Sequence, residues 1–442
     1  MTGRRIAVIG SGVSGLTAAY ILARTDEVTI FEADDRLGGH ADTHLVPGPG
    51  GTRTGIDTGF IVYNERTYPQ LTRLLRELEV ATQPSEMSMS VSCSGCGVGY
   101  AGKRGLPGLG AGLPRGGARY LRMLTEVTRF HRTARKALAS GAGGDLPLGD
   151  FLREGRFSAY FTAHFAAPLV GAVWSCPPGQ ALRYPAGYLF AFLANHGMLA
   201  VSGSPQWRTV TGGSRNYVER VAARLAKVRV SSPVRSVRRY PDGVEVRDAS
   251  GEALDFDAAV IATHPDQALR LLAAPTPAEQ SVLGAFAYTP NEAVLHTDAT
   301  LLPPRDAVRA SWNYSLNCRD GGASEDSGTS QDRGISQDSG AGRPPTRVSY
   351  YLNRLQGLPR GPGHPDYIVT LGGRQDVDPA RVIDVMEYAH PAYTRESVAA
   401  QRRLPELRTP VTAFAGAYHG WGFHEDGCAS GVAAARALGG SW

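Results

Sequence analysis

The sequence predicts an α/β fold with a parallel sheet, and successive segments at its start predict it. Residues 4–9 form a short apolar run of the kind found in buried parallel strands. A glycine-rich loop, residues 10–15, follows at once and opens an Ala- and Leu-rich helical stretch that runs to about Arg24. A second strand, residues 27–31, ends at Glu32. This order is typical of a Rossmann-type dinucleotide-binding unit.

Each part of this unit has a physical role. Gly10 permits the tight turn out of the strand, Gly12 lets the backbone approach a pyrophosphate, and Gly15 lets the helix pack closely on the strand. The helix N-terminus near Ser14 offers unpaired N–H groups to phosphates. Glu32 is suited to bind ribose hydroxyls, and an acid there disfavours a 2′-phosphate, so NADP is not expected.

The segment after the second strand resembles a known signature. Residues 32–40 read Glu-Ala-Asp-Asp-Arg-Leu-Gly-Gly-His and resemble the second motif of FAD enzymes of the amine oxidase and phytoene desaturase superfamily. In that superfamily an Arg-x-Gly-Gly turn folds under the pyrophosphate and ribitol. The resemblance therefore implies non-covalently bound FAD rather than NAD. Around this motif and the similar segment 57–60, it implies cofactor contacts from Ala33, Arg36, Gly38, Gly39, His40, Thr58 and Gly59.

The resemblance returns in two later pieces of the chain. Residues 211–214, Thr-Gly-Gly-Ser, and the strand-like segment 257–265 resemble further parts of the FAD domain, with Val234 expected near the adenine. Residues 414–431 resemble the final motif, whose helix N-terminus points at the flavin. The cofactor residues implied there are Gly416, Phe423, His424, Asp426 and Gly427.

One position departs from the superfamily pattern. An acid that binds FAD hydroxyls usually follows the Ala-Gly pair, and this chain has Ala417 there. Glu425 and Asp426 are the nearby acids considered as replacements.

A narrower resemblance covers nearly the whole chain. Residues 57–66, 206–214, 293–298 and 423–427 look like one bacterial subgroup of NAD/FAD-binding, amine-oxidase-like proteins. Genes of that subgroup often neighbour methyltransferases similar to cyclopropane fatty acid synthase. The resemblance thus points to modified acyl chains as substrate.

These motifs predict the domain organisation. A discontinuous Rossmann-type FAD-binding domain is expected over residues 1–75, 205–275 and 405–442. An inserted α+β, amine oxidase-like substrate domain is expected over 76–204 and 276–404. Residues 319–346 are dominated by Ser, Asp, Gly and Gln and are predicted to be a disordered insertion.

Composition excludes some partners and locations. The net charge is +5, and only three of the 46 basic residues are lysines, an arginine bias that fits a GC-rich genome. No nucleic-acid partner is therefore expected. The sequence shows neither a run of about 20 apolar residues nor a signal-peptide pattern, so a cytoplasmic protein is expected. Residues 117–138 form a basic amphipathic segment, which is either an ordinary domain helix or a site of peripheral membrane contact.

Five scattered cysteines argue against a disulfide framework. Cys93 and Cys96 form a lone Cys-x-x-Cys pair. A zinc site needs about four ligands, and no second pair follows at a suitable spacing, so no metal is expected. A redox dithiol and two small residues in a Gly/Ser-rich loop are the remaining interpretations.

The reaction itself is less determined. Amine oxidases of the superfamily often carry a lysine on a substrate-domain strand, and the comparable stretch here, residues 290–296, has none. This favours a dehydrogenase or desaturase acting on a hydrophobic acyl or isoprenoid chain. An amine oxidase using oxygen, a redox-neutral isomerase and a non-catalytic binding protein of the same fold remain alternatives.

Aromatic and imidazole side chains are the candidates for the pocket. We single out Trp174, His196, Trp207, Trp421 and Phe423. Of these, His196 and Trp421, together with His424, are the candidate catalytic residues, with packing in the core as the alternative for each.

Overall fold

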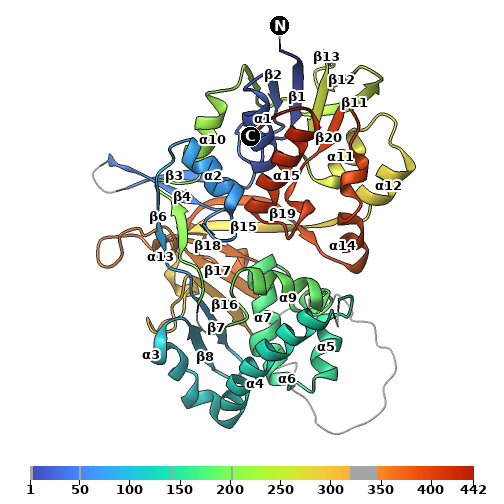
Figure 1. Ribbon diagram of the computed structural model, residues 1–442. Helices are drawn as coiled ribbons and strands as arrows, with labels where there is room; N and C mark the ends of the chain where they lie inside the picture. Colours follow the sequence, from blue (N-terminus) through green and yellow to red (C-terminus); the bar gives the residue numbers. More distant parts are fainter. Residues whose placement is uncertain (1–2, 49–50, 142–143, 201–202, 319–345) are drawn as a thin grey trace.

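The computed structural model describes residues 3–48, 51–141, 144–200, 203–318 and 346–442. The chain folds into two lobes, one above the other in Figure 1. The first lobe is built on a parallel sheet, and the second combines a seven-stranded sheet with a layer of helices. Apart from Thr346, the predicted insertion 319–346 lies outside the described residues.

A five-stranded parallel sheet organises the first lobe. β1 lies in the middle, and its apolar residues are buried on both faces, as its sequence predicts. The strands come from three separate parts of the chain, and the predicted α/β fold is confirmed. In sheet order they are β10 (Lys227–Arg229), β2 (Glu27–Phe31), β1 (Arg5–Ile9), β14 (Ala258–Ile261) and β20 (Thr412–Phe414).

Two helices that are far apart in sequence begin beside each other at this sheet. These are α1 (Val13–Leu22) and α15 (His424–Ala437). A Cβ on Gly431 would lie 2.3 Å from the Ser14 carbonyl oxygen, so only glycine allows the two helices to approach this closely. Both helices follow the carboxyl ends of parallel strands, which is where open α/β sheets bind their ligands.

Smaller elements complete the first lobe. A three-stranded antiparallel sheet and several helices pack around the parallel sheet, and two short sheets lie toward the second lobe. The helices are α2 (Pro69–Glu77), α10 (Arg215–Ala222), α11 (Pro265–Leu271), α12 (Pro277–Leu283) and α14 (Arg395–Gln401). The strands are β11 (Val234–Tyr240), β12 (Gly243–Asp248), β13 (Ala253–Phe256), β3 (Thr43–Pro47), β4 (Arg53–Asp57), β5 (Tyr63–Asn64), β6 (Thr82–Ser85) and β9 (Trp207–Val210).

A seven-stranded mixed sheet forms the second lobe. Its two longest strands, β15 and β19, pair with each other and cross between the lobes in Figure 1. In sheet order the strands are β19 (Val382–Ala392), β15 (Ala287–His296), β18 (Ile368–Leu371), β17 (Arg347–Tyr351), β16 (Trp312–Leu316), β7 (Met89–Cys93) and β8 (Gly99–Gly102).

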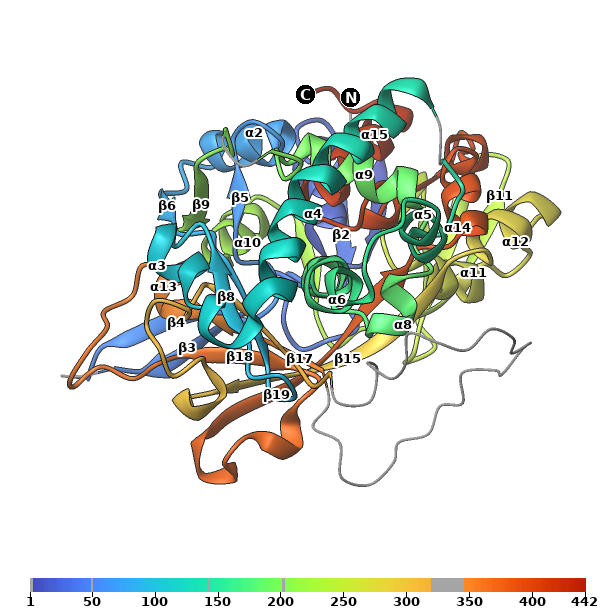
Figure 2. The same cartoon turned by 90° about the horizontal axis from the view of Figure 1, so that it is seen from below.

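Helices gather beside this sheet, as the view from below shows (Figure 2). They are α3 (Gly105–Gly110), α4 (Leu113–Ser140), α5 (Leu148–Glu154), α6 (Ala159–Phe161), α7 (Ala167–Trp174), α8 (Pro178–Ala181), α9 (Ala186–Asn195) and α13 (Leu352–Leu355). Among the described residues, no helix is both long and apolar enough to cross a membrane.

Helix α4 contains the basic amphipathic segment predicted for residues 117–138. Gly117 interrupts it with a left-handed φ of 50°. Beyond that kink, Tyr120, Met123 and Phe130 are buried in the core of the second lobe, while its arginines lie mostly outward. An ordinary domain helix packs in this way. Membrane contact by this segment stays a prediction.

Candidate active site

The glycine loop after β1 is shaped by two close contacts and one open side. A Cβ on Gly10, whose φ is 96°, would lie 2.8 Å from the Ala262 carbonyl oxygen. A Cβ on Gly15 would lie 2.0 Å from the carbonyl oxygen of Gly10. A Cβ on Gly12, by contrast, would have no described atom within 4 Å apart from those of Gly12 itself and its two chain neighbours. Packing therefore requires glycine at 10 and 15, whereas Gly12 faces space that a ligand can fill.

Glu32 lies directly beside this loop. Its carboxylate accepts hydrogen bonds from the Ser11 N–H at 2.9 Å and from the Ser11 hydroxyl. The N–H of Ser232 donates to the Glu32 carbonyl at 2.8 Å, so the segment that leads to Val234 runs alongside. The predicted ribose and adenine residues thus lie together, with Ala33 exposed between them.

The Arg36–His40 turn closes over the other side of the loop. Gly38 bridges to Gly12, and its N–H donates to the Ser11 hydroxyl at 3.1 Å. A Cβ on Gly39 would lie 3.3 Å from the Gly12 Cα. Arg36 donates to the Gly39 carbonyl at 3.0 Å and pairs with Asp42 at 2.8 Å, so its guanidinium stabilises the turn itself.

Residues 57–59 lock this turn to a distant part of the chain. A Cβ on Gly59 would lie 2.3 Å from the His40 carbonyl oxygen, and the Thr58 N–H donates to the Asp42 carbonyl at 2.9 Å. The buried Asp57 carboxylate accepts from the N–H and hydroxyl of Ser214, at 2.9 and 2.8 Å. Burial raises the pKa of Asp57 to about 6. Asp57 is therefore a positioning residue that ties the segment to the Gly212–Ser214 element.

The N-terminus of α15 completes this half of the site. The Gly416 N–H donates to the Ser430 hydroxyl at 2.9 Å, which folds the Ala-Gly segment onto the helix. A Cβ on Gly427 would lie 2.6 Å from a methyl carbon of Val13, so the N-termini of α1 and α15 meet. The site residues taken from the glycine loop, the Gly38–Gly39 turn and this helix therefore gather at one edge of the parallel sheet.

The two acids near Ala417 already have partners. Glu425 accepts from the N–H groups of Gln70 and Leu71, both at 3.0 Å, and so caps α2. Asp426 accepts from the Phe423 N–H at 2.9 Å and caps its own helix. Burial raises the pKa of each carboxyl to about 7. A compensating role for either acid in cofactor binding stays a prediction.

The candidate histidines occupy packed positions. The His424 ring stacks on Phe60 with centroids 3.6 Å apart, and its Nε2 lies 3.0 Å from the Tyr217 hydroxyl. The Nδ1 of His196 lies 3.0 Å from the Phe192 carbonyl oxygen. Burial lowers the pKa of His424 to about 3 and that of His196 to about 4. Both imidazoles are neutral at neutral pH, which fits the packing alternative for each.

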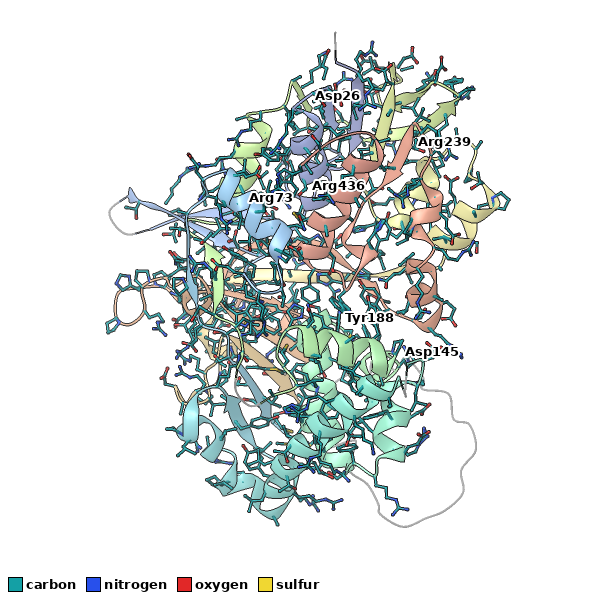
Figure 3. All side chains as sticks on the ribbon, viewed as in Figure 1. Asp26, Arg73, Asp145, Tyr188, Arg239 and Arg436 are labelled. Carbon is teal, nitrogen blue, oxygen red and sulfur yellow. The ribbon has the colours of Figure 1, made fainter. Side chains whose placement is uncertain are left out.

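The five aromatic and imidazole candidates meet in one cluster between the lobes. The Trp174 indole N–H donates to the Trp421 carbonyl at 3.0 Å. The His196 ring stacks on Trp207, with centroids 6.1 Å apart, and lies 5.9 Å from Phe423. Tyr188, which Figure 3 places at the junction of the lobes, adds a ring 6.3 Å from Trp421. We call this the aromatic cluster.

A second imidazole cluster was not predicted. The His40 ring lies 6.5 Å from His264 and 5.5 Å from His390. Burial lowers the pKa of all three, that of His390 to about 4. The Asn291 amide lies 2.8 Å from the Nδ1 of His390 on β19, so an amide in the stretch that lacks a lysine meets an imidazole from the neighbouring strand. Only the fold brings these residues together, although His40 itself follows a predicted turn.

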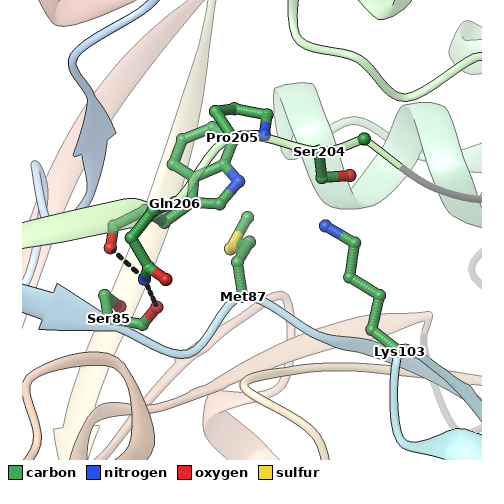
Figure 4. A pocket seen from close by; sticks show the side chains of 8 residues that line it. Ser85, Met87, Lys103, Ser204, Pro205 and Gln206 are labelled. Carbon is green, nitrogen blue, oxygen red and sulfur yellow. Dashed lines mark hydrogen bonds between the residues drawn. The ribbon is translucent and has the colours of Figure 1, made fainter.

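A cleft of about 330 Å³ is lined by Trp207 together with residues around Ser85, Lys103 and Gly203 (Figure 4). The Lys103 amine reaches toward it, while Met87 and Trp207 supply apolar walls. The Gln206 amide is held by the carbonyls of Ser85 and Trp207, at 3.3 and 2.8 Å. Burial lowers the pKa of Lys103. Among its lining residues, Trp207 was a pocket candidate from sequence, whereas nothing in the sequence indicated a site at Lys103.

Comparison with known proteins supplies the family context. The model of a family described as flavin containing amine oxidoreductase matches residues 13–357. Coproporphyrinogen III oxidase of Mycobacterium leprae is 26% identical over 292 residues, 62% of each chain. This chain thus spans less than two thirds of that relative's length.

Solved structures share the fold at low sequence identity. Cyclohexylamine oxidase from Brevibacterium oxydans superposes with a TM-score of 0.64 at 17% identity, covering 99% of this chain and 98% of that one. A CLA-producing fatty acid isomerase from P. acnes gives a TM-score of 0.63 at 14% identity, covering 97% of each chain. These likenesses indicate the fold alone.

Proposed function

Because the chain belongs to the flavin containing amine oxidoreductase family, we propose that it is an FAD-dependent dehydrogenase of a hydrophobic substrate that carries a carboxylate. A modified fatty acyl chain is the substrate that fits best. The expectations of an FAD cofactor and of an FAD-dependent oxidoreductase are confirmed at the level of the family. The substrate and the direction of chemistry are the proposal.

The residues around the glycine loop fit FAD. The open side of Gly12, beside the N-terminus of α1, suits a pyrophosphate, and Glu32 next to it suits a ribose. The Gly38–Gly39 turn borders the same space, and the N-terminus of α15 contributes the positive end of its helix dipole. When bound, the flavin supplies hydride acceptance, and the protein supplies position and a dry environment.

The aromatic cluster is the observation that carries the proposal. Trp421 and Phe423 stand immediately before α15 and are half-buried, and they pack with the buried rings of Trp174 and His196 into an apolar wall with few polar atoms. Residues 290–296 provide no amine, and Asn291 in that stretch contacts His390 of the neighbouring strand β19. Such a surface excludes water and suits hydride removal from carbon in an apolar chain more than capture of a hydrated amine.

The Lys103 cleft supplies the carboxylate contact. Trp207 belongs to both the cleft lining and the aromatic cluster, so the cleft adjoins the cluster. A carboxylate beside the partly desolvated ammonium would offset the burial cost that lowers the Lys103 pKa. The arrangement therefore suits an anionic head beside Lys103 and an apolar tail near Trp207.

The surface next to this cleft suits delivery from a lipid layer. Lys103 lies two residues before α3, where Leu106 is 85% exposed, and Leu121 on α4 is 53% exposed. Arg119 and Arg122 are exposed on the same stretch of α4. Exposed leucines with arginines bind anionic membrane surfaces by burial and charge together. Peripheral membrane contact is thus part of this proposal.

A porphyrinogen is the second candidate substrate. The Mycobacterium leprae relative is named for coproporphyrinogen, and such a macrocycle also joins apolar surface to carboxylates. The Lys103 cleft accepts that chemistry as well.

Product analysis tests the proposal. The purified holoenzyme is incubated separately with branched or cyclopropane-bearing fatty acids, with coproporphyrinogen and with primary amines. The masses of the products are then measured by mass spectrometry. We expect an acid product lighter by two hydrogens. Turnover of the porphyrinogen selects the second candidate. Peroxide with amines alone, or a rearranged acid of unchanged mass, would overturn the dehydrogenase in favour of an amine oxidase or an isomerase.

A further inference from the structure

Three thiols and one imidazole meet in the second lobe, away from the cofactor residues. The sulfur atoms of Cys93, Cys96 and Cys318 and a ring nitrogen of His164 all lie within 4.8 Å of one another. The Cys96 Sγ is 3.4 Å from the His164 Nε2. Cys93 and His164 are buried. We call these four residues the Cys₃His cluster.

The fold brings three separate segments to this point. Cys93 ends β7, and Gly97, with a φ of 72°, turns the chain so that its N–H donates to the Cys93 carbonyl at 2.9 Å. Strand β16 runs parallel to β7 and pairs Leu316 with Cys93, so Cys318 follows just beyond. His164 lies on a π-helical turn, Thr162–Ala166, before α7. Such turns often mark functional sites.

We propose that the Cys₃His cluster binds a zinc ion in a closed tetrahedral site. Zinc with thiolate and imidazole ligands requires ligand atoms about 3.5–3.8 Å apart, so small side-chain rotations close the observed arrangement. The three cysteines bind as thiolates, so the protons that their thiols carry in the free site are released as the ion binds. The Cys-x-x-Cys turn supplies two ligands, and the fold supplies the other two.

The histidine is oriented for this role. Its Nδ1 lies 3.1 Å from the Tyr160 carbonyl oxygen, which holds the proton on that nitrogen and leaves the Nε2 lone pair toward the sulfurs. Its ring also stacks on the Tyr160 ring, with centroids 4.0 Å apart. A backbone acceptor on the far nitrogen is the usual arrangement of a metal-bound histidine.

The surroundings match the charge of such a site. Zinc with three thiolates and a neutral imidazole carries one negative charge. The Arg115 side chain lies over the turn, since a Cβ on Gly97 would lie 2.7 Å from its Cδ and 3.2 Å from its Nε. A redox dithiol, the interpretation open from sequence, needs neither the third thiol nor the oriented imidazole.

The ion would tie together elements that reach the aromatic cluster. The turn between β7 and β8 and the end of β16 join the π-helical turn, which continues into α7 and ends at Trp174. The Tyr100 hydroxyl already donates to the His164 carbonyl at 2.7 Å. Zinc would thus fix this helical layer on the edge of the sheet.

Metal analysis of the full chain tests the site. The holoenzyme is expressed with zinc and washed, and its zinc content is measured beside Cys318→Ser and His164→Ala variants. A Cys176→Ala variant is the matched control, because Cys176 is a buried cysteine outside the cluster. We expect about one zinc per chain in the wild type and control, and a loss of at least about fivefold in the other two.

Two measurements on the wild type keep the test independent of variant folding. Cobalt added to metal-free protein should produce intense bands of a tetrahedral thiolate site, at longer wavelengths than flavin absorbs. Zinc should protect Cys93, Cys96 and Cys318 from alkylation, as read by peptide mass spectrometry. A native protein that holds no zinc, shows no cobalt bands and carries a Cys93–Cys96 disulfide would overturn the proposal in favour of a redox pair.

Discussion

The first lobe builds its site from backbone, and the second builds its sites from side chains. Around Gly12, the space for a cofactor exists because Cβ atoms are absent and helix N-termini point inward. In the second lobe, Lys103 and the Cys₃His cluster act through ammonium, thiol and imidazole groups. A backbone site fails when an atom is added, whereas a side-chain site fails when a group is removed. Four predictions test this contrast.

The largest effect is expected from adding atoms beside the glycine loop. Gly12→Val places a branched side chain in open space, so the polypeptide should fold normally while flavin affinity falls by about a hundredfold or more. The flavin-to-protein ratio and the Tm of the apoprotein check both halves of this prediction. Gly15→Val is the matched contrast, because its side chain meets the Gly10 carbonyl and should lower the apoprotein Tm. A full flavin content in Gly12→Val would contradict the assignment of the cofactor to this loop.

Removing one charge should weaken substrate binding without abolishing chemistry. Lys103→Met should raise KM for a fatty acid by about tenfold to a hundredfold, with kcat changed little, because a charge-assisted contact is worth about 1.5–3 kcal/mol. Steady-state kinetics with the acid and its methyl ester measure the difference. Lys136→Met, on the exposed face of α4, is the control. Equal loss with acid and ester would contradict a carboxylate contact.

The buried carboxyl at α15 should make stability depend on pH. Burial raises the pKa of Asp426 from 3.8 to about 7, so the folded state holds its proton longer than the unfolded state. Stability from this group is therefore present below about pH 4 and is lost as pH rises toward 7. Asp426→Asn should reduce the fall in unfolding free energy between those values by on the order of 2 kcal/mol. Urea denaturation of both proteins at pH 4.5 and 7.5 measures this difference. The same change in unfolding free energy with pH in the wild type and in Asp426→Asn would contradict the prediction.

The smallest effect concerns the exposed leucines. Leu106→Ser with Leu121→Ser should weaken binding to anionic vesicles by about threefold to tenfold, without lowering Tm, because both side chains are largely exposed. Ile383→Ser, exposed on β19, is a matched control. Vesicle co-sedimentation measures the change. If the wild type, the double leucine variant and the control sediment equally with vesicles, α3 and the start of α4 have no membrane role.

The contrast between the lobes also explains what the sequence could predict. The strand, glycine loop and acid around Gly12 and Glu32 are contiguous, and each follows from local geometry, so the parallel sheet and its FAD edge were predictable. The Cys₃His cluster was not, because His164 and Cys318 reach Cys93 only through strand pairing and helix packing. Lys103 and Trp207 lie about a hundred residues apart in the chain and meet only in the folded structure, so the cleft that they share was not predictable either.

The histidines show a further limit. His424 and His40 were placed near the flavin by motif, and the structure holds both beside the predicted turns. Sequence could not indicate that burial lowers the pKa of each, or that His264 and His390 would join His40. Such properties depend on what surrounds a side chain, which only the packed structure fixes.

The most direct test of the central claim is an anaerobic visible spectrum of the purified holoenzyme during addition of a branched or cyclopropane-bearing fatty acid. We predict that the oxidised flavin band bleaches with the acid and that Lys103→Met requires more acid for the same bleaching. A flavin band that the acid leaves unchanged, but that a primary amine bleaches, would contradict the account.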